Sequence, residues 1–288
     1  MRILVTGAAG NLGGLLLGDL ARDGHDVIGA DVVGDDVERL DICDFSATRR
    51  LLQDHRPQLV IHAAAWTDVD GCAREPDRAL QVNGFGTQNV ALAAAAVDAE
   101  LAYISSNEVF SGRDIQPLDE FASPAPRNPY GYSKRAGELS VVAHCPRHYI
   151  VRTAWLFAHG GRNFIQAVLG AGRSGKPVRV VSNEVANPTY TNDLSAALVR
   201  LVASGRHGTY HFVNEGACSR LQFARYVFDR SGLADVPIEA ISSHQWPRPA
   251  SPPEHAALVN HAGRLLGITL RPWRAAVEAF LSKEGWLS

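Results

Sequence analysis

Short apolar runs alternate with amphipathic stretches through the first half of the chain. The runs at 1–5, 25–31, 58–65 and 101–106 have the composition of buried strands, and the alanine-rich segment 79–97 has that of a long helix. Strands that alternate with helices build a parallel sheet with helices on both faces. The pattern therefore predicts an α/β protein with a Rossmann-type doubly wound parallel sheet.

The pattern becomes less regular in the second half. Strands are expected at 178–181 and 208–214, and helices at 192–203 and 221–231. The segment 246–253 contains four prolines and cannot be helical, because proline supplies no N–H group and restricts the residue before it. We expect it to be a stiff loop at the border of the functional site.

The first predicted strand runs directly into a glycine-rich turn, Thr6-Gly7-Ala8-Ala9-Gly10-Asn11-Leu12-Gly13, and an apolar-faced helix follows. Glycines allow a tight turn there, so that backbone N–H groups and the helix N-terminus can approach a pyrophosphate. Strand, turn and helix in this order predict a dinucleotide-binding site. Its expected members are Gly7, Gly10, Asn11, Leu12 and Gly13.

The second predicted strand ends on the carboxylate of Asp31, at the distance expected for an acid that hydrogen-bonds the adenosine ribose diol. A 2′-phosphate would be repelled there, so NAD(H) is favoured over NADP(H), although a basic residue such as Arg39 could accommodate the phosphate. Asp41 and Ile42, which end the next short strand, suit the edge and the face of the adenine. Alternatively, Asp41 is a helix cap or a loop acid.

Tyr130 and Lys134 stand four residues apart on a predicted helix and therefore share a face. A phenol ordinarily titrates near pH ~10, so it exchanges protons near neutral pH only if its anion is stabilised. The ammonium of Lys134 is placed to lower the pKa of the phenol while reaching a cofactor ribose. This arrangement indicates an oxidoreductase; the alternative is an ordinary surface pair.

Composition narrows the function classes. A net charge of −2 without a basic block argues against a nucleic-acid surface. The chain starts directly with a strand, and no apolar run reaches the ~18 residues of a membrane span, so a cytoplasmic protein is expected. Cysteines 43, 72, 145 and 218 are widely spaced and should be free thiols. No metal-ligand spacing is present among the histidines and cysteines, and no catalytic metal is expected.

Several motifs together resemble those of a known family. They are the glycine-rich turn, Ala63-Ala64-Ala65-Trp66-Thr67-Asp68-Val69-Asp70, Tyr130 with Lys134, Arg152-Thr153-Ala154-Trp155-Leu156-Phe157, Gly160-Gly161-Arg162-Asn163-Phe164, 187–194 and 248–251. In content and order they resemble the extended short-chain dehydrogenase/reductases, and within these the dTDP-4-dehydrorhamnose reductases and related nucleotide-sugar 4-ketoreductases. The resemblance runs through most of the chain.

The resemblance implies a reaction and a set of roles. Ser106 would hydrogen-bond the carbonyl oxygen of a nucleotide-sugar substrate, Tyr130 would donate a proton to it as hydride arrives from NAD(P)H, and Lys134 would hold the ribose. The small side chains of Ala63, Ala64 and Ala65 would let the cofactor lie close to the backbone.

Substrate contacts are implied at further positions. Thr67, Val69 and Trp155 match family positions near the sugar, and Asn163 and Arg248 suit the diphosphate or the nucleotide. Trp155 could instead belong to the core, and Arg248 could be a solvated loop residue. A homodimer formed by the helix that carries Tyr130 and by the helix around 91–97 is implied by analogy with relatives.

The chain departs from the family beside the reacting carbon. Ser106-Asn107-Glu108 stands where rhamnose-forming reductases usually have Thr-Asp-Tyr. The glutamate resembles that of the 4,6-dehydratases, but Asn107 cannot donate a proton as a carboxylic acid does, so dehydration is disfavoured. Asn107 and Glu108 are expected beside the substrate, and they leave the sugar and its stereochemistry open. Glu108 could also be a plain surface acid.

Two lobes are expected on these grounds. A dinucleotide-binding domain would comprise 1–152, with about 186–206 returning to it, and a smaller C-terminal substrate-binding lobe would comprise 153–185 and 207–288. The leading function is reduction of the 4-keto group of a nucleotide-activated 6-deoxy sugar. The alternatives are an epimerase or dehydratase that retains NAD⁺, and a non-catalytic regulatory subunit of the same fold.

Overall fold

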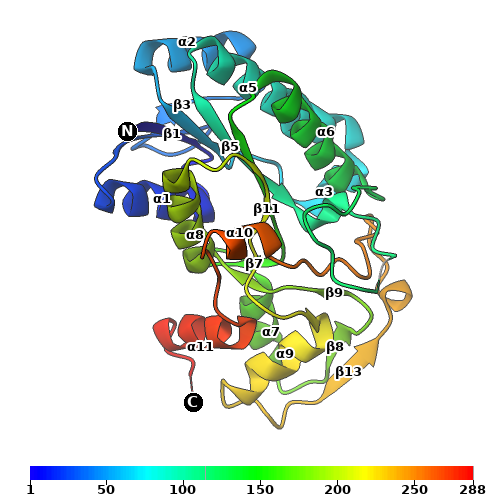
Figure 1. Ribbon diagram of the computed structural model, residues 1–288. Helices are drawn as coiled ribbons and strands as arrows, with labels where there is room; N and C mark the ends of the chain where they lie inside the picture. The colour runs from blue at the N-terminus through cyan, green and yellow to red at the C-terminus, as the bar shows by residue number, and fades with distance from the viewer. Residues whose placement is uncertain (114, 288) are drawn as a thin grey trace.

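A seven-stranded parallel sheet forms the larger part of the molecule (Figure 1). The computed structural model describes residues 1–113 and 115–287. The strand order is β11-β6-β5-β4-β1-β2-β3, so the chain starts in the middle of the sheet and winds outward in both directions. The strands are β1 (Arg2–Thr6), β2 (Asp26–Asp31), β3 (Glu38–Arg39), β4 (Leu59–His62), β5 (Glu100–Ser106), β6 (His148–Thr153) and β11 (Gly208–His211).

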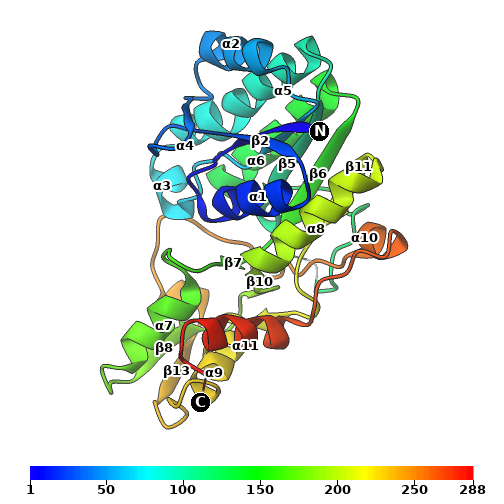
Figure 2. The same cartoon turned by 90° about the vertical axis from the view of Figure 1, so that its left-hand side faces the viewer.

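Helices cover both faces of this sheet, as Figure 2 shows from the side. On one face α1 (Asn11–Arg22) packs against α8 (Thr191–Ser204), and their leucines join a core that includes inward side chains of β1 and β6. On the other face lie α2 (Phe45–His55), α5 (Thr87–Ala96) and α6 (Pro129–His144), over a second apolar core. The predicted doubly wound α/β fold is confirmed.

The predicted helix at 79–97 is one helical run with an interruption. Its parts are α4 (Pro76–Ala79), the π-helical η1 (Leu80–Gly86) and α5. A π-helical turn inserts a residue into the helical ladder and is frequent at functional sites. Here it aims the buried side chain of Asn83 at Trp66, whose backbone N–H donates to Asn83 Oδ1 at 2.8 Å and whose carbonyl accepts from Asn83 Nδ2 at 3.0 Å.

The second lobe hangs below the carboxyl edge of the sheet in Figure 1. Its core is aromatic, with the rings of Phe157, Phe223 and Phe280 packed together. The secondary structure of this part is a set of short elements. They are β7 (Leu156–Phe157), α7 (Phe164–Gly172), β8 (Val178–Val181), β9 (Val185–Ala186), β10 (Thr189–Tyr190), β12 (Cys218–Ser219), α9 (Arg220–Asp229), β13 (Ile238–Ile241), η3 (Ser243–Gln245), α10 (His261–Leu265) and α11 (Trp273–Lys283).

The strand β11 corrects the expected lobe boundary. We expected 207–288 to lie wholly in the substrate lobe, but β11 pairs with β6 as the edge strand of the large sheet, and α10 packs beside it. The physical reason is that Tyr210 and Phe212 are apolar enough to extend the core beneath α8. The chain therefore leaves the sheet after His211, and not before 207.

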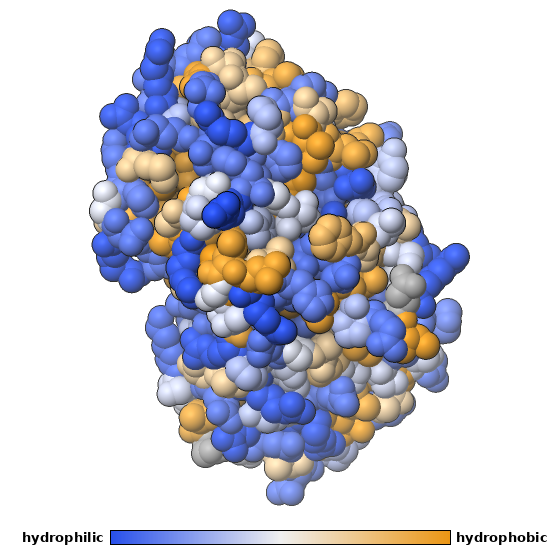
Figure 3. Space-filling model, viewed as in Figure 1, coloured by the Kyte–Doolittle hydropathy of each residue, from blue (hydrophilic) through white to orange (hydrophobic). Residues whose placement is uncertain are grey.

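The surface and the cysteines complete the description. Hydrophilic residues cover most of the face seen in Figure 3, with hydrophobic residues in scattered groups. Within the described ranges no helix is long and apolar enough to cross a bilayer. All four cysteines are free thiols, as expected. The described part of the chain contains no cluster of three His, Cys, Asp or Glu side chains suited to a metal ion.

Candidate active site

The glycine-rich turn lies between β1 and α1 and presents bare backbone. Gly7 has φ of +75°, and a Cβ there would lie 2.5 Å from the backbone nitrogen of Ala64. A Cβ on Gly13 would lie 2.0 Å from the carbonyl oxygen of Gly7, which also accepts a 3.0 Å hydrogen bond from the Gly10 N–H. Only glycine fits at positions 7 and 13, and α1 begins directly behind the turn at Asn11, so its first N–H groups remain available to an anion.

The alanine turn after β4 forms the facing wall. The N–H of Ala63 donates to the carbonyl of Thr6 at 3.1 Å, which fixes this turn to the end of β1, and the backbone of Ala63 and Ala64 touches Gly7. The alanines are partly buried. Two stretches far apart in sequence therefore meet where the cofactor pyrophosphate was expected, and the residues present fit a dinucleotide.

Asp31 is tied to the same turn. Its Oδ2 accepts from the Ala9 N–H at 3.0 Å, and its Oδ1 accepts from the Val33 N–H at 3.3 Å. In the pairing of β2 with β3, Arg39 stands opposite Asp31. The carboxylate expected to meet the ribose diol thus has a cation as its neighbour on the next strand.

The expected adenine site is only partly supported. Asp41 and Ile42 were expected to end a strand, but β3 ends at Arg39, because the chain turns where the Cys43 N–H donates to Asp41 Oδ1 at 2.9 Å. Asp41 is an exposed loop acid, while Ile42 is buried in the core against Gly86. Their adenine contacts stay predictions.

Ser106 and Tyr130 meet at the carboxyl end of β5. Tyr130 lies in the first turn of α6, whose N-terminus is capped by Asn128 through a 2.8 Å hydrogen bond from the Gly131 N–H to Asn128 Oδ1. The hydroxyl of Ser106 accepts from the Glu108 N–H at 3.2 Å and donates to Asn107 Oδ1 at 3.4 Å, and it lies close enough to Tyr130 to influence the pKa of the phenol. Ser106 and Tyr130 are each 8% exposed.

The electrostatics of this pair differ from the sequence expectation. Burial raises the pKa of Tyr130, the charge of Glu108 raises it further, and the hydrogen bond from Ser106 only partly offsets both. We expected Lys134 to lower the pKa of the phenol. Burial instead lowers the pKa of Lys134 itself to about 7, which weakens that cation near neutral pH. Tyr130 is therefore a protonated phenol at neutral pH, the form that can donate a proton.

Asn107 and Glu108 form the short 3₁₀ turn η2 (Asn107–Val109) directly after Ser106. Asn107 is buried and donates through Nδ2 to the carbonyl of Ala256 at 3.1 Å, so it anchors the loop before α10. Glu108 Oε2 accepts from Asn128 Nδ2 at 2.6 Å. Burial raises the pKa of Glu108 to about 7. Glu108 is half-buried and paired with Asn128, so it is not a plain surface acid, and its contact with the substrate stays a prediction.

A cavity of about 690 Å³ opens in the second lobe beside this centre. Its wall includes Phe164, Val178, Glu184, Arg220, Trp246 and Arg248. A second cavity of about 360 Å³ shares Glu184, Trp246 and Arg248 with it and reaches Arg127 and Ser251, near the N-terminus of α6. A long molecule could therefore extend from Tyr130 into the second lobe.

Arg248 and Trp155 are both fixed by neighbours. Arg248 Nε donates to Asp70 Oδ1 at 2.9 Å, and Asp70 lies on α3 (Val69–Arg74). Burial works against the charge of Asp70, but the hydrogen bonds from Arg248 and Ala250 outweigh it, so the pKa of Asp70 is lowered. Trp155 has φ of +41°, rare for a bulky residue, and its ring lies 3.7 Å from the Arg220 guanidinium carbon.

The remaining predicted substrate residues lie at the rim of this region. Val69 opens α3 and packs with Tyr130 in a small apolar cluster, whereas Thr67 is exposed just before it. Asn163 caps α7 by accepting from the Gln166 N–H at 3.1 Å, and Nδ2 donates to the carbonyl of Ala158 at 2.8 Å. Asn163 therefore has a structural role next to the cavity residue Phe164.

Arg220 and Glu184 were missed by sequence reasoning. Arg220 Nε lies 3.4 Å from Glu184 Oε2, and burial lowers the pKa of the guanidinium although Glu184 opposes this. They meet because β9 pairs with β12, and α9 then starts at Arg220. The only local signal is the motif Ser219-x-x-Gln222, a capping box that marks a helix start but not an arginine in a binding cavity.

The parallel sheet, the glycine-rich turn, and Ser106 at the end of β5 beside a helix α6 that carries Tyr130 and Lys134 define an extended short-chain dehydrogenase/reductase. Comparisons with known proteins narrow this class. The model of the RmlD substrate binding domain family matches residues 1–285. A dTDP-4-dehydrorhamnose reductase of Mycobacterium tuberculosis is 36% identical, over 98% of this chain and 92% of that protein.

Two solved structures agree with this. The dTDP-4-dehydrorhamnose reductase structure from Clostridium acetobutylicum has a TM-score of 0.94 at 34% identity, over 99% of this chain and 100% of that one. That from Bacillus anthracis, in complex with NADP, has a TM-score of 0.91 at 35% identity, over 98% and 99%. The chain belongs to the RmlD family of dTDP-4-dehydrorhamnose reductases, which confirms the resemblance found in the sequence.

Proposed function

We propose that this protein uses NADH or NADPH to reduce the 4-keto group of a nucleotide-activated 6-deoxy sugar, with Tyr130 as the proton donor. The observation that carries the proposal is that Ser106 and Tyr130 lie together at the carboxyl edge of the sheet, the edge that also carries a turn with no room for a side chain at Gly7 and Gly13. The names of the family members, which are reductases of dTDP-linked keto sugars, support the substrate class.

The chain's own residues have distinct tasks in this reaction. A bound nicotinamide supplies hydride to the carbonyl carbon. The Ser106 hydroxyl donates a hydrogen bond to the carbonyl oxygen and polarises it. Tyr130, protonated because burial and Glu108 raise its pKa, gives its proton to the same oxygen. Lys134, one turn further along α6, holds the ribose and lies beneath the phenol.

The second lobe binds the nucleotide in this proposal. Arg220 and Arg248 line the 690 Å³ cavity and supply cations for the diphosphate, while the rings of Phe164 and Trp246 are available to the base. Val69 and Trp155 contact the sugar between the two parts. Glu108 accepts a hydrogen bond from a sugar hydroxyl, which makes it the residue that distinguishes this site from those of rhamnose-forming relatives.

The cofactor preference is NADH over NADPH, with both accepted. Asp31 is held at the end of β2 by two backbone N–H groups and receives the ribose diol, while Arg39 opposite it offers a cation to a 2′-phosphate. Arg39→Ala should lower kcat/KM for NADPH by about tenfold, one charge-assisted contact, and leave that for NADH unchanged. Equal losses with both cofactors would contradict this role of Arg39.

The function is tested by NADH and NADPH oxidation with dTDP-4-keto-6-deoxy sugars, with the product identified by NMR. Tyr130→Phe should lower kcat by about 10²–10⁴-fold, the range for loss of a general acid. Tyr132→Phe is the matched control, because Tyr132 lies on the same helix but is 60% exposed. A 4-hydroxy product would establish the reductase and show its stereochemistry.

Other results would assign the protein differently. Turnover without net oxidation of added cofactor, together with tightly bound NAD⁺, would indicate an epimerase or dehydratase. No turnover and tight association with a second enzyme would indicate a regulatory subunit. Equal activity of Tyr130→Phe and Tyr132→Phe would contradict Tyr130 as the proton donor.

A further inference from the structure

A third polar side chain follows Tyr130 and Lys134 on the same face of α6. Glu138 is fully buried, one helical turn beyond Lys134, and takes no part in the reaction described above. Ser105 donates to its Oε1 at 2.7 Å, and Arg152 donates to Oε1 at 2.8 Å and to Oε2 at 3.0 Å. Arg135 adds a 2.8 Å bond to Oε2.

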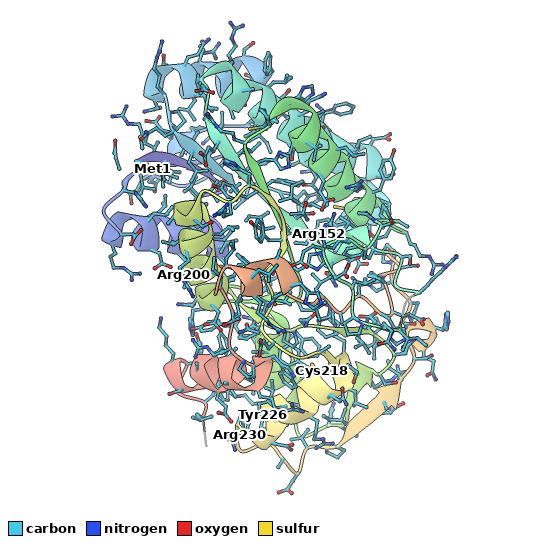
Figure 4. The ribbon with its side chains drawn as sticks, in the orientation of Figure 1. Met1, Arg152, Arg200, Cys218, Tyr226 and Arg230 are labelled. Carbon is cyan, nitrogen blue, oxygen red and sulfur yellow. The ribbon has the colours of Figure 1, made fainter. Side chains whose placement is uncertain are left out.

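Burying the charges of Glu138 and Arg152 costs free energy that an apolar pair would not cost. Removing two ions from water costs several kcal/mol per ion, and well-packed apolar residues often stabilise a fold as well or better. Arg152 lies in the interior, at the end of β6 between the sheet and the second lobe (Figure 4). Burial works against the charge of Glu138, but the hydrogen bonds and charge of Arg152 outweigh it and lower the pKa of Glu138. The carboxylate is therefore a permanent anion.

Lys134 is the nearby group that needs such an anion. It is 2% exposed, and its Nζ lies 4.3 Å from the centre of the Tyr103 ring. The titratable or charged groups around it on α6 and the elements packed against α6 are Glu138, Tyr130, Cys72, Arg78, Glu108, His62, Tyr103 and Arg152.

Glu138 is the carboxylate whose charge raises the pKa of Lys134. Glu108 has a pKa of about 7 and is partly protonated near neutral pH. Burial raises the pKa of Cys72 to about 11, so its thiol is neutral. His62 is neutral too, because burial and the charge of Lys134 lower its pKa to about 3. The charge of Glu138 therefore opposes the desolvation of Lys134 most directly.

We propose that Glu138, held by Arg152 and Ser105, is a positioning residue that keeps Lys134 cationic on the helix face that also carries Tyr130. The inference rests on the proposed function, because it explains how a buried lysine stays available to the ribose and the phenol. Glu138 acts through Lys134 and touches neither substrate nor cofactor. It makes the Tyr130-Lys134 pair a three-residue series along one helix face.

The chain permits a direct test, because it has only three lysines, Lys134, Lys176 and Lys283. Protein labelled with ¹³C at the lysine ε-carbon gives one signal for each, and the pH titration of each signal reports its own amine. In the unaltered protein Lys134 should titrate near pH 7. In Glu138→Gln this midpoint should fall by about one pH unit, roughly a tenfold loss of the cation at a given pH. Lys176 and Lys283 are internal controls and should not move.

Two further variants separate charge from packing. Ser105→Ala removes a partner of Glu138 but keeps the carboxylate, and should leave the Lys134 midpoint within a few tenths of a pH unit. If Glu138→Gln does not fold, Arg135→Gln gives the reciprocal test, since Arg135 is partly exposed and its removal unmasks the carboxylate. The Lys134 midpoint should then rise. An unchanged Lys134 midpoint in Glu138→Gln, or in Arg135→Gln where Glu138→Gln does not fold, would overturn the inference.

A kinetic measurement relates the titration of Lys134 to turnover. The basic limb of the pH profile of kcat/KM should move down with the Lys134 midpoint in Glu138→Gln and remain in place in Ser105→Ala. A shifted midpoint without any turnover in the unaltered protein would leave the inference standing and reject the proposed function. Turnover with an unshifted midpoint in Glu138→Gln would do the opposite.

Discussion

Two glutamates at helix α6 are in opposite states, Glu108 packed beside its N-terminus and Glu138 within the helix. On the substrate side, Glu108 has one hydrogen-bond partner, Asn128, and burial raises its pKa to about 7. On the sheet side, Glu138 is buried more completely, yet its pKa is lowered, because Arg152, Ser105 and Arg135 satisfy the charge. The comparison shows that partners, more than depth, decide the charge of a buried carboxyl.

The different protonation behaviour of Glu108 and Glu138 matches their different tasks. A carboxyl that titrates near neutral pH and faces Arg220 and Arg248 across the site can change its protonation when a charged substrate enters. A carboxylate fixed by two arginines cannot, and suits a constant background charge. The protonation of Glu108 can therefore respond to the substrate, whereas the charge of Glu138 stays constant.

The largest effect on stability should come from removing the main partner of Glu138. Arg152→Leu leaves Glu138 as a buried charge with its strongest partner removed, and should lower the free energy of unfolding by about 3–5 kcal/mol. Arg135→Leu is the matched control, because that arginine is partly exposed and should cost less than about 1 kcal/mol. Urea unfolding at pH 7.5 measures both. Equal losses would mean that the two arginines hold the carboxylate equally and would contradict the leading role of Arg152.

A smaller effect on stability, confined to a defined pH range, is expected from Glu108. The folded-state pKa of Glu108 is raised from 4.5 to about 7, so folding loses stability as pH rises between these values, because the unfolded chain ionises first. The loss amounts to about 3 kcal/mol at ~1.4 kcal/mol per pKa unit. Glu108→Gln keeps the acceptor for Asn128 and should remove this loss.

The measurement for Glu108→Gln is urea unfolding at pH 5 and pH 8. Relative to the unaltered protein, the variant should gain stability at pH 8 and none at pH 5. Asp119→Asn serves as a control for removal of an acid, since its neighbourhood gives it no comparable partner near α6. The same difference at both pH values would show that Glu108 is ionised throughout and would contradict its raised pKa.

The sequence predicted Tyr130 and Lys134 on α6 far better than Glu138 on the same face of that helix. Tyr130 and Lys134 were found because helical spacing joins them, and the glycine turn because its strand, turn and helix are consecutive. Glu138 follows the same spacing but was overlooked, because a glutamate on a helix is ordinarily solvated. Only its packing against β5 and β6 shows that it is buried.

The second lobe was the least predictable part. Arg220 reaches the cavity through the pairing of β9 with β12, a contact of distant segments that no local pattern indicates. Arg248 was proposed by its residue type, but its partner Asp70 lies far away in the sequence, on α3. Local sequence periodicity predicts helices and strands, whereas contacts between distant loops become evident only in the folded structure.

The smallest of these effects concerns Ser105, whose hydroxyl completes the shell around Glu138. Ser105→Ala should lower the free energy of unfolding by about 1.5 kcal/mol at pH 7.5, the lower end for a hydrogen bond to a charged group. The folded-state pKa of Glu138 is lowered, so the stability that its partners provide is present above the ordinary carboxyl pKa and is lost as pH falls through the folded value. The deficit of Ser105→Ala should therefore shrink toward acid pH, opposite to the window of Glu108→Gln. Unfolding at pH 7.5 and at a pH well below the ordinary carboxyl value of 4.5 tests this, because a deficit independent of pH would reflect packing of the serine and not the charge of its partner.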